Sequence, residues 1–284
     1  MEIKSLTNTD FETIFKAFSQ AFADYEVQIN EKQFNTMLRR RGFNPDLSFA
    51  AFENGDIVSF TLNGIGNFNK ILTAYDTGTG TLKEYRGKGL ATEIFEYSIP
   101  FLKEAGVRQY LLEVLQHNEN AVSVYRKLGF ETTREFNYFI CKNEEVKNEI
   151  KNIEFDYFTR EIFSLYNKTT ENAWDYYPSW QNSIASVLRW NAHIFCMGLF
   201  IDNEVAGYFI FDTLLGDIMQ LAVVKQHRRK GVGSLLLQEM LKRNKNDVIK
   251  ILNADTTCTS LVEFLKAKNI GISGKQFEMI KNIE

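Results

Sequence analysis

A basic turn that occurs twice is the feature that most constrains this chain. The first copy is Arg86-Gly87-Lys88-Gly89-Leu90-Ala91. The second copy, Arg228-Arg229-Lys230-Gly231-Val232-Gly233, lies 142 residues later, which is half of the 284-residue chain. A glycine-bearing turn between a strand and a helix directs free backbone N–H groups and the positive end of the helix dipole at one point. Each copy therefore predicts an anion site suited to a pyrophosphate.

The pattern of strands and helices around the two turns also repeats. Apolar spacing, caps and turn residues predict the order βααβββαβαβ in each half. Such an order is typical of an α/β (α+β) fold, with a mixed twisted sheet flanked by helices in each half. In the first half the expected strands are 3–6, 48–53, 57–62, 71–82, 109–116 and 129–140. The first expected helix follows the capping residues 8–10, and the later helices are 30–41, 90–105 and 118–128. In the second half the expected strands are 153–157, 194–201, 205–212, 217–224, 248–253 and 275–280, and the helices are 159–167, 179–191, 232–243 and 257–268.

The repeat predicts two tandem domains joined by a polar segment. Residues 142–152 (KNEEVKNEIKN) are charged and contain no aromatic side chain, as is typical of a linker. We therefore expect an N-terminal domain at 1–142, a linker at 143–152 and a C-terminal domain at 153–284.

The composition excludes several classes of protein. Apolar residues make up 44% of the chain, too many for a disordered protein, and the net charge of −3 gives no basic excess for nucleic acid. The three cysteines are far apart, which favours reduced thiols in the cytoplasm. Neither they nor the histidines show the spacing of metal ligands, so no metal site is expected. No apolar run approaches the roughly 20 residues that a membrane helix needs. The oligomeric state is not readable.

Both turns resemble the Arg/Gln-x-x-Gly-x-Gly/Ala signature of the GNAT (Gcn5-related N-acetyltransferase) superfamily. In the first half, Leu112-Glu113-Val114, then Asn118 and Ala121, then the run from Tyr125 to Phe130, resemble a later motif of the same family. Two copies of the turn at equal spacing, each between a strand and a helix, make this a specific signal, whereas one copy would be weak. The resemblance covers nearly the whole chain as two tandem units.

The resemblance implies acetyl-CoA as co-substrate. The turn would hold the pyrophosphate, and the pantetheine arm would lie between two splayed parallel strands, here 71–82 and 109–116. A backbone N–H of the first strand would polarise the thioester carbonyl, and an amine would attack it directly. The implied cofactor-binding residues are Thr81, Leu82, Arg86, Gly87, Lys88, Gly89, Leu90, Ala91 and Asn118, with Arg228, Arg229, Lys230, Gly231, Val232, Gly233 and Ser234 in the second domain.

Two residues of the first domain are candidates for acid–base chemistry. Glu113 lies between two leucines on one face of its strand, where partial burial would raise its pKa toward that of a useful base, although an edge glutamate reaching water fits equally well. The resemblance makes Tyr125 the acid that protonates the departing thiolate; otherwise it simply packs a helix. Asn118 is explained equally well as a helix cap. Asp76 and His117 are weaker candidates.

The second domain departs from this pattern. The position of Glu113 falls on Leu252 or Asn253, and that of Tyr125 on Phe264 or Leu265, none of which can donate or accept a proton in the same way. Asp217 is a weak base candidate. This domain could bind acyl-CoA, or only hold the architecture, without turnover.

Three functions remain open. The first is an acetyl-CoA-dependent N-acetyltransferase that acts on a small-molecule or peptide amine and is catalytic in the first domain. The second is a non-catalytic acyl-CoA-binding regulatory or assembly module. The third, a transferase that uses a charged tRNA, is disfavoured by the lack of a basic excess.

Overall fold

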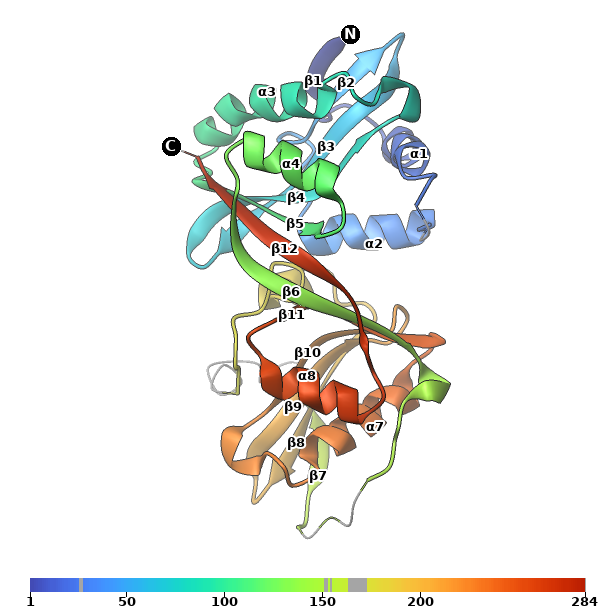
Figure 1. Cartoon of the computed structure of the whole chain (residues 1–284), viewed down its shortest axis with the longest axis vertical. Coiled ribbons are helices and arrows are strands. Elements are labelled where there is room, and N and C mark those ends of the chain that lie inside the picture. The colour runs from blue at the N-terminus through green and yellow to red at the C-terminus, as the bar shows by residue number, and fades with distance from the viewer. Residues whose placement is uncertain (26–27, 151–152, 154, 163–172, 284) are drawn as a thin grey trace. The chain divides into compact units, whose positions relative to one another are not determined.

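A computed structural model describes residues 1–25, 28–150, 153, 155–162 and 173–283. The chain divides into two compact units. The N-terminal unit comprises Met1–Arg134, Ile184–Trp190 and Phe277–Glu284, and the C-terminal unit comprises Glu135–Ser183 and Asn191–Gln276. Figure 1 labels the elements of both.

The N-terminal unit is a mixed sheet with helices on both faces. Its strand order is β1-β2-β3-β4-β5-β12. One face packs Phe60 and Leu62 of β3 against α1 and α2, while Val58 of the same strand faces Leu90 and Ile94 of α3. The pairing of β2 with β3 shifts at Val58, and this bulge interrupts the two-residue alternation of the strand. The elements of this unit are β1 (Glu2–Ser5), α1 (Phe11–Ala21), α2 (Glu31–Arg41), β2 (Phe49–Glu53), β3 (Asp56–Phe68), β4 (Ile71–Thr81), α3 (Leu90–Glu104), β5 (Gln109–Leu115), α4 (Glu119–Lys127), the beginning of β6 (Glu131–Lys142), α6 (Ile184–Arg189) and the end of β12 (Ile272–Asn282).

Local sequence signals set these boundaries. Asp10 caps α1 by accepting from the Thr13 N–H, and Asn30 and Gln33 form a reciprocal capping box at the start of α2. Between β2 and β3, Asn54 and Gly55 adopt φ values of 53° and 90°, the left-handed pair that a tight hairpin turn needs.

The C-terminal unit repeats the arrangement in the strand order β6-β11-β10-β9-β8-β7. Its largest core cluster packs Leu235, Leu236 and Met240 of α7 against strand residues such as Phe209 and Phe211. Beside β6, its elements are β7 (Phe158–Glu161), β8 (Ile194–Ile201), β9 (Glu204–Asp212), β10 (Asp217–Val223), α7 (Val232–Arg243), β11 (Val248–Asp255) and α8 (Thr259–Ala267). The prediction of two α/β units with mixed sheets is confirmed.

The two units exchange their last strands, so the contact units differ from the linear domains expected at 1–142 and 153–284. Residues 136–142 of β6 pair antiparallel with β11 in the C-terminal unit. The end of β12 belongs to the N-terminal unit, where the Ile283 N–H donates to the Arg108 carbonyl and Met279 is buried beside Tyr110. A sequence repeat identifies which segments are equivalent, but it does not reveal which copy of a strand completes which sheet.

The region that joins the halves differs most from the sequence-based expectations. Residues 159–161, expected to begin a helix, belong instead to the strand β7 (Phe158–Glu161), whose Phe158 ring stacks on Phe200 of β8 at 5.0 Å. The expected helix at 179–191 is helical only at Ile184–Arg189. Residues 163–167 of the expected helix 159–167 lie outside the described residues. The expected linker carries structure as well, since the Lys147 N–H donates to the Lys268 carbonyl.

Candidate active site

The first basic turn has the geometry of an anion cradle. Gly87 and Gly89 adopt φ values of 76° and 82°, and Gly89 caps α3. An added Cβ at either glycine would meet no atom within 4 Å, so the space over the turn is open. Within the described part of the chain, no backbone N–H of residues 87–92 donates to a protein acceptor. These groups and the helix dipole are therefore available to an anion.

The side chains of several predicted cofactor residues hold the turn in place or pack into the core. The Arg86 guanidinium donates to the carbonyls of Thr81 at 3.1 Å and Ala21 at 2.7 Å, and to the Asp24 carboxylate at 3.1 Å. It therefore ties the turn to the end of α1. The Thr81 hydroxyl shares a hydrogen bond of 2.8 Å with Ser59, and the side chains of Leu82 and Leu90 pack into the core.

Beyond the turn, β4 and β5 form the parallel pair that the sequence analysis expected to splay. They pair at only three positions, the last being Tyr75 with Leu111, although both strands continue. The pairing of β3 with β4 shifts between Leu62–Gly78 and Asn63–Asp76, which leaves Thr77 as the extra residue of a β-bulge. The bulge at Thr77 lies just beyond Tyr75, the last residue of β4 that pairs with β5. From this point on, the backbone groups of β4 that face β5 are not paired with that strand.

The bulge brings together residues that the sequence considered separately. The Tyr125 hydroxyl of α4 donates to Asp76 Oδ2 at 3.0 Å, and the Thr79 hydroxyl donates to the same oxygen at 2.9 Å. In a regular strand, residues 76 and 79 would face opposite sides. The extra residue at 77 turns them to one side. From the sequence alone, Asp76 is only a weaker candidate than Glu113.

Burial shapes the proton chemistry of this pair. Burial raises the pKa of Asp76 above its ordinary value, although the hydrogen bonds from Thr79 and Tyr125 oppose the shift. Asp76 Oδ1 is buried and has no hydrogen-bond partner among the described residues. Burial, and next the Asp76 charge, raise the pKa of Tyr125 well above its ordinary value, so the hydroxyl stays protonated at neutral pH.

Glu113 lies on β5, half-buried, as expected from its place between two leucines. Its Oε2 accepts a hydrogen bond from the hydroxyl of Tyr75, which lies at the last paired position of β4. Burial, and next the charge of Glu113, raise the pKa of Tyr75 well above its ordinary value. The Arg41 guanidinium donates to the carbonyl of Thr77 at the bulge, at 2.7 Å. Asn118, by contrast, caps α4 by accepting from the Ala121 N–H.

The second basic turn repeats this backbone geometry. Arg229 and Gly231 adopt φ values of 63° and 95°, in the places of Gly87 and Gly89. The Arg228 guanidinium donates to the Val223 carbonyl at 2.9 Å and pairs with the Asp175 carboxylate at 3.0 Å. A bulge at Met219 and a single parallel pair, Asp217 with Lys250, complete the repeat.

The register of the two units settles which residues are equivalent. Tyr75 pairs with Leu111, and Asp217, 142 residues after Tyr75, pairs with Lys250. Counting two residues along each strand, Glu113 corresponds to Leu252. The helix caps Asn118 and Cys258 correspond, so Tyr125 corresponds to Leu265 and Asp76 to Ile218. The weak base candidate Asp217 lies 3.7 Å from the Lys250 ammonium, at the start of β10.

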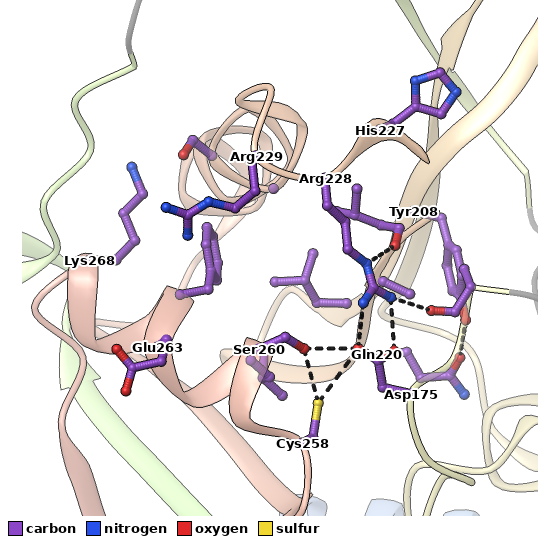
Figure 2. A pocket seen from close by; sticks show the side chains of 18 of the residues that line it. Asp175, Tyr208, Gln220, His227, Arg228, Arg229, Cys258, Ser260, Glu263 and Lys268 are labelled. Atoms are coloured by element: carbon purple, nitrogen blue, oxygen red, sulfur yellow. Dashed lines mark hydrogen bonds and ion pairs between the residues drawn. The ribbon is translucent and has the colours of Figure 1, made fainter. Parts of the chain in front are cut away.

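A cavity of about 1000 Å³ lies in the C-terminal unit at this second turn (Figure 2). It is lined by the turn, β10 and α8, together with residues 173–178. In Figure 2, Arg229, Glu263 and Lys268 lie on one side of it, and Asp175, Tyr208 and Gln220 on the other. The Tyr208 hydroxyl donates to Gln220 Oε1 at 2.8 Å and accepts from the indole N–H of Trp174.

Comparison with known proteins identifies the family. The model of the acetyltransferase (GNAT) family matches residues 10–130 and 159–261, most of the chain. The chain belongs to this family. Two solved structures share the fold over 100% of this chain at 12% identity. One is a GCN5-related N-acetyltransferase from Sphaerobacter thermophilus, with a TM-score of 0.74 and 96% of that chain covered. The other is a tandem GNAT protein from the clavulanic acid biosynthesis pathway, with a TM-score of 0.72 and 98% of that chain covered. The tandem GNAT form predicted from the sequence is confirmed.

Among curated proteins, the N-alpha-acetyltransferase MAK3 of Arabidopsis thaliana is 30% identical over 97 residues. The match covers 34% of this chain and 51% of that protein, so the chain spans about half the length of this relative. Among the residues that the structure describes, no helix is long and apolar enough to cross a membrane. Over the same described residues, no group of three or more His, Cys, Asp or Glu side chains is arranged to hold a metal ion.

Proposed function

We propose that this GNAT protein is an acetyl-CoA-dependent N-acetyltransferase whose N-terminal unit is catalytic. One observation carries the proposal: the Tyr125–Asp76 hydrogen bond lies at the bulge where β4 and β5 stop pairing, and Glu113 stands on the facing strand. A hydrogen-bonded proton donor and acceptor, Tyr125 and Asp76, thus lie at the place where the family fold would present the thioester, and a second carboxylate, Glu113, lies on the neighbouring strand.

The turn at residues 86–91 would hold the pyrophosphate on its backbone N–H groups, with Asn118 fixing the start of α4 nearby. The pantetheine arm would pass between β4 and β5. A backbone N–H at the Thr77 bulge would then donate to the thioester carbonyl, where negative charge develops as the amine attacks.

The chemistry requires one proton to leave the amine and one to reach the sulfur. The amine nitrogen bonds to the acyl carbon while the carbon–sulfur bond breaks, and a carboxylate takes the amine proton. Glu113 can take it directly. Asp76 can take it as well, and the existing hydrogen bond then allows Asp76 to reprotonate Tyr125 after that hydroxyl has protonated the thiolate. The raised pKa of Asp76 makes it a stronger base than an exposed aspartate.

The acceptor is a primary amine on a peptide or a small molecule. The name of the Arabidopsis relative favours the α-amino group of a peptide as the first acceptor to test. The C-terminal turn, Arg228 to Ser234, is proposed as a second site for a CoA thioester, without turnover.

The decisive experiment compares Tyr125→Phe and Glu113→Gln with the wild type, using acetyl-CoA, a panel of amines and CoA thiol release as the readout. We expect kcat to fall about 100-fold or more in Tyr125→Phe, with little change in the KM for acetyl-CoA, because general acid catalysis typically contributes 10²–10⁴. Tyr97→Phe, on an exposed residue of α3, serves as the control. Unchanged kcat in both site variants would exclude the assigned roles.

A second candidate function is a non-catalytic acyl-CoA-binding module, which the C-terminal unit favours because aliphatic side chains replace its acid and base. Calorimetry with acetyl-CoA followed by the amine panel separates the two functions. Binding without acetylation of any amine would favour the module, whereas acetyl transfer that depends on Tyr125 would favour the enzyme.

A further inference from the structure

The cavity of the C-terminal unit is large for a small-molecule pocket. Its volume of about 1000 Å³ lies at the upper end of the range of small-molecule pockets, roughly 300–1,000 Å³. It begins at the second basic turn and extends past β10 to Trp174 and Pro178. Proposed acetyl transfer in the N-terminal unit makes no use of this space.

One side of the cavity is suited to an anionic head. Of its charged lining residues, five are Lys or Arg and three are Asp or Glu. Arg228 is paired with Asp175, which leaves four lining cations, Lys147, Arg229, Lys230 and Lys268. Arg229 and Lys268 lie on the same side of the cavity as Glu263 of α8 (Figure 2). The turn adds the N-terminus of α7, whose Gly231 cap adopts φ 95° as Gly89 does in the first unit.

The adjoining walls are apolar. Met219, Leu221 and Val223 line the cavity from β10, and Leu261 and Phe264 line it from α8. The Phe264 ring would lie 3.2 Å from a Cβ built at Gly233, so it covers the first turn of α7. A chain of methylenes buried against these side chains would gain free energy with each carbon, whereas a two-carbon acyl group would leave much of the wall uncovered.

The residues equivalent to the proposed catalytic groups can neither donate nor accept a proton. Asp76, Glu113 and Tyr125 correspond to Ile218, Leu252 and Leu265, and both Ile218 and Leu265 are buried. Loss of all three polar groups to aliphatic side chains removes acid–base chemistry from this unit.

We propose that the C-terminal unit binds a long-chain acyl-CoA and holds it without turnover. The proposal rests on the second CoA-thioester site of the proposed function and names its ligand class. The CoA pyrophosphate occupies the turn, and the acyl chain fills the apolar part of the cavity. The N-terminal unit retains acetyl-CoA as its co-substrate.

The test uses the full chain carrying Gly89→Asp, which places a carboxylate at the first turn and leaves the second intact. Calorimetry compares palmitoyl-CoA, acetyl-CoA and free palmitate. Each buried methylene strengthens binding by about fourfold, so we expect palmitoyl-CoA to bind at least ~100-fold more tightly than acetyl-CoA. We also expect no CoA thiol release from bound palmitoyl-CoA in the presence of the amine panel.

A matched pair of variants locates the acyl chain. Leu261→Glu places a charge in the cavity wall and should weaken palmitoyl-CoA binding by at least ~10-fold. Val262→Glu makes the same change at the next residue of α8, which is also partly buried but does not line the cavity, and should leave binding within about twofold. Equal weakening by both, palmitate binding as tight as that of palmitoyl-CoA, or no preference over acetyl-CoA would overturn the proposal. Failure of the proposed acetyl transfer would appear separately, as a wild type that acetylates no amine.

Discussion

The two units have similar backbone geometry and differ in the side chains at the equivalent positions of their candidate sites. Each has a basic turn with two left-handed residues, a helix that starts at a glycine cap, a bulge in the preceding strand and a parallel pair that ends early. The N-terminal unit has Asp76 and Tyr125 hydrogen-bonded at the bulge and Glu113 on the neighbouring strand, whereas the C-terminal unit has Ile218, Leu265 and Leu252 at the equivalent positions.

This difference distinguishes the backbone features that could bind a ligand from the side chains that a chemical reaction would need. The turn and the bulge consist of backbone geometry, which tolerates exchange of neighbouring side chains. Proton transfer requires specific groups with suitable pKa values. The C-terminal unit has the turn and the bulge without the acid–base groups of the N-terminal unit, and it contains a cavity of about 1000 Å³.

The largest expected effect comes from placing the same carboxylate at the two turns. Gly89→Asp should raise the KM for acetyl-CoA by roughly 10- to 100-fold, because a negative charge would face the pyrophosphate at a site where no atom obstructs the new side chain. Gly231→Asp should leave the acetylation kinetics unchanged, although its Cβ would press on the tip of Ile153. The measurement is the acetyl-CoA dependence of amine acetylation.

The opposite ranking of the two turn variants would transfer catalysis to the C-terminal unit. Circular dichroism spectra matching those of the wild type would show that each variant is folded.

Asp76→Asn should separate activity from stability in the N-terminal unit. Removing this carboxylate should lower kcat/KM by roughly 10- to 100-fold if Asp76 relays the amine proton. Burial raises the pKa of Asp76 in the folded state above its value in the unfolded state. At a pH between the two values, the folded protein therefore keeps the proton on Asp76, whereas the unfolded chain has released it. Ionising Asp76 therefore costs stability as pH rises, and Asp76→Asn should be at least as stable as the wild type at pH 7.

Urea unfolding at pH 7, together with the pH profile of kcat/KM, checks this prediction. Loss of the acidic limb in Asp76→Asn but not in Glu113→Gln would assign the base to Asp76, and the reverse result would assign it to Glu113. A large loss of stability in Asp76→Asn would contradict the argument from burial.

The sequence predicted the repeated part of the structure because repetition and turn chemistry are local properties. Glycines at turns that need positive φ, helix caps and apolar periods all act over a few residues, which is why the turns at 86–91 and 228–233 and most strands agree with the structure. Residues 159–161 of the strand β7 were mistaken for the start of a helix, since the apolar spacing of this strand is short and its stability comes from pairing with β8.

The remaining features depend on long-range register. The exchange of β6 and β12 joins residues more than 100 positions apart, and no local signal specifies it. The link between Asp76 and Tyr125 depends on one extra residue at Thr77, which reverses the facing of the strand beyond it. The cavity depends on how α8, β10 and residues 173–178 pack together, so a correct alignment of the two turns could not reveal it.

The smallest expected effect compares the two arginines that hold the turns. Arg228 and Asp175 are about three-quarters buried, at 27% and 26% side-chain exposure, whereas Arg86 and Asp24 are 41% and 50% exposed. Arg228→Ala should therefore cost about 1–3 kcal/mol of stability, because it leaves a partly buried carboxylate with fewer donors, and Arg86→Ala about 0.5–1 kcal/mol. Urea unfolding of both variants at pH 7 measures the difference.

The pH dependence of that difference tests its cause. Burial favours a higher pKa for Asp175, but hydrogen bonds from Arg228 and Ser260 outweigh it and lower the pKa below the ordinary value. A carboxyl group with a lowered folded pKa stabilises the protein above its unfolded pKa, and this contribution disappears as pH falls through the folded pKa. The excess cost of Arg228→Ala should thus be complete near neutral pH and should shrink below about pH 4. A pH-independent cost would show that Arg228 acts through its hydrogen bond to the Val223 carbonyl, as a neutral brace of the turn, and that its ion pair contributes little.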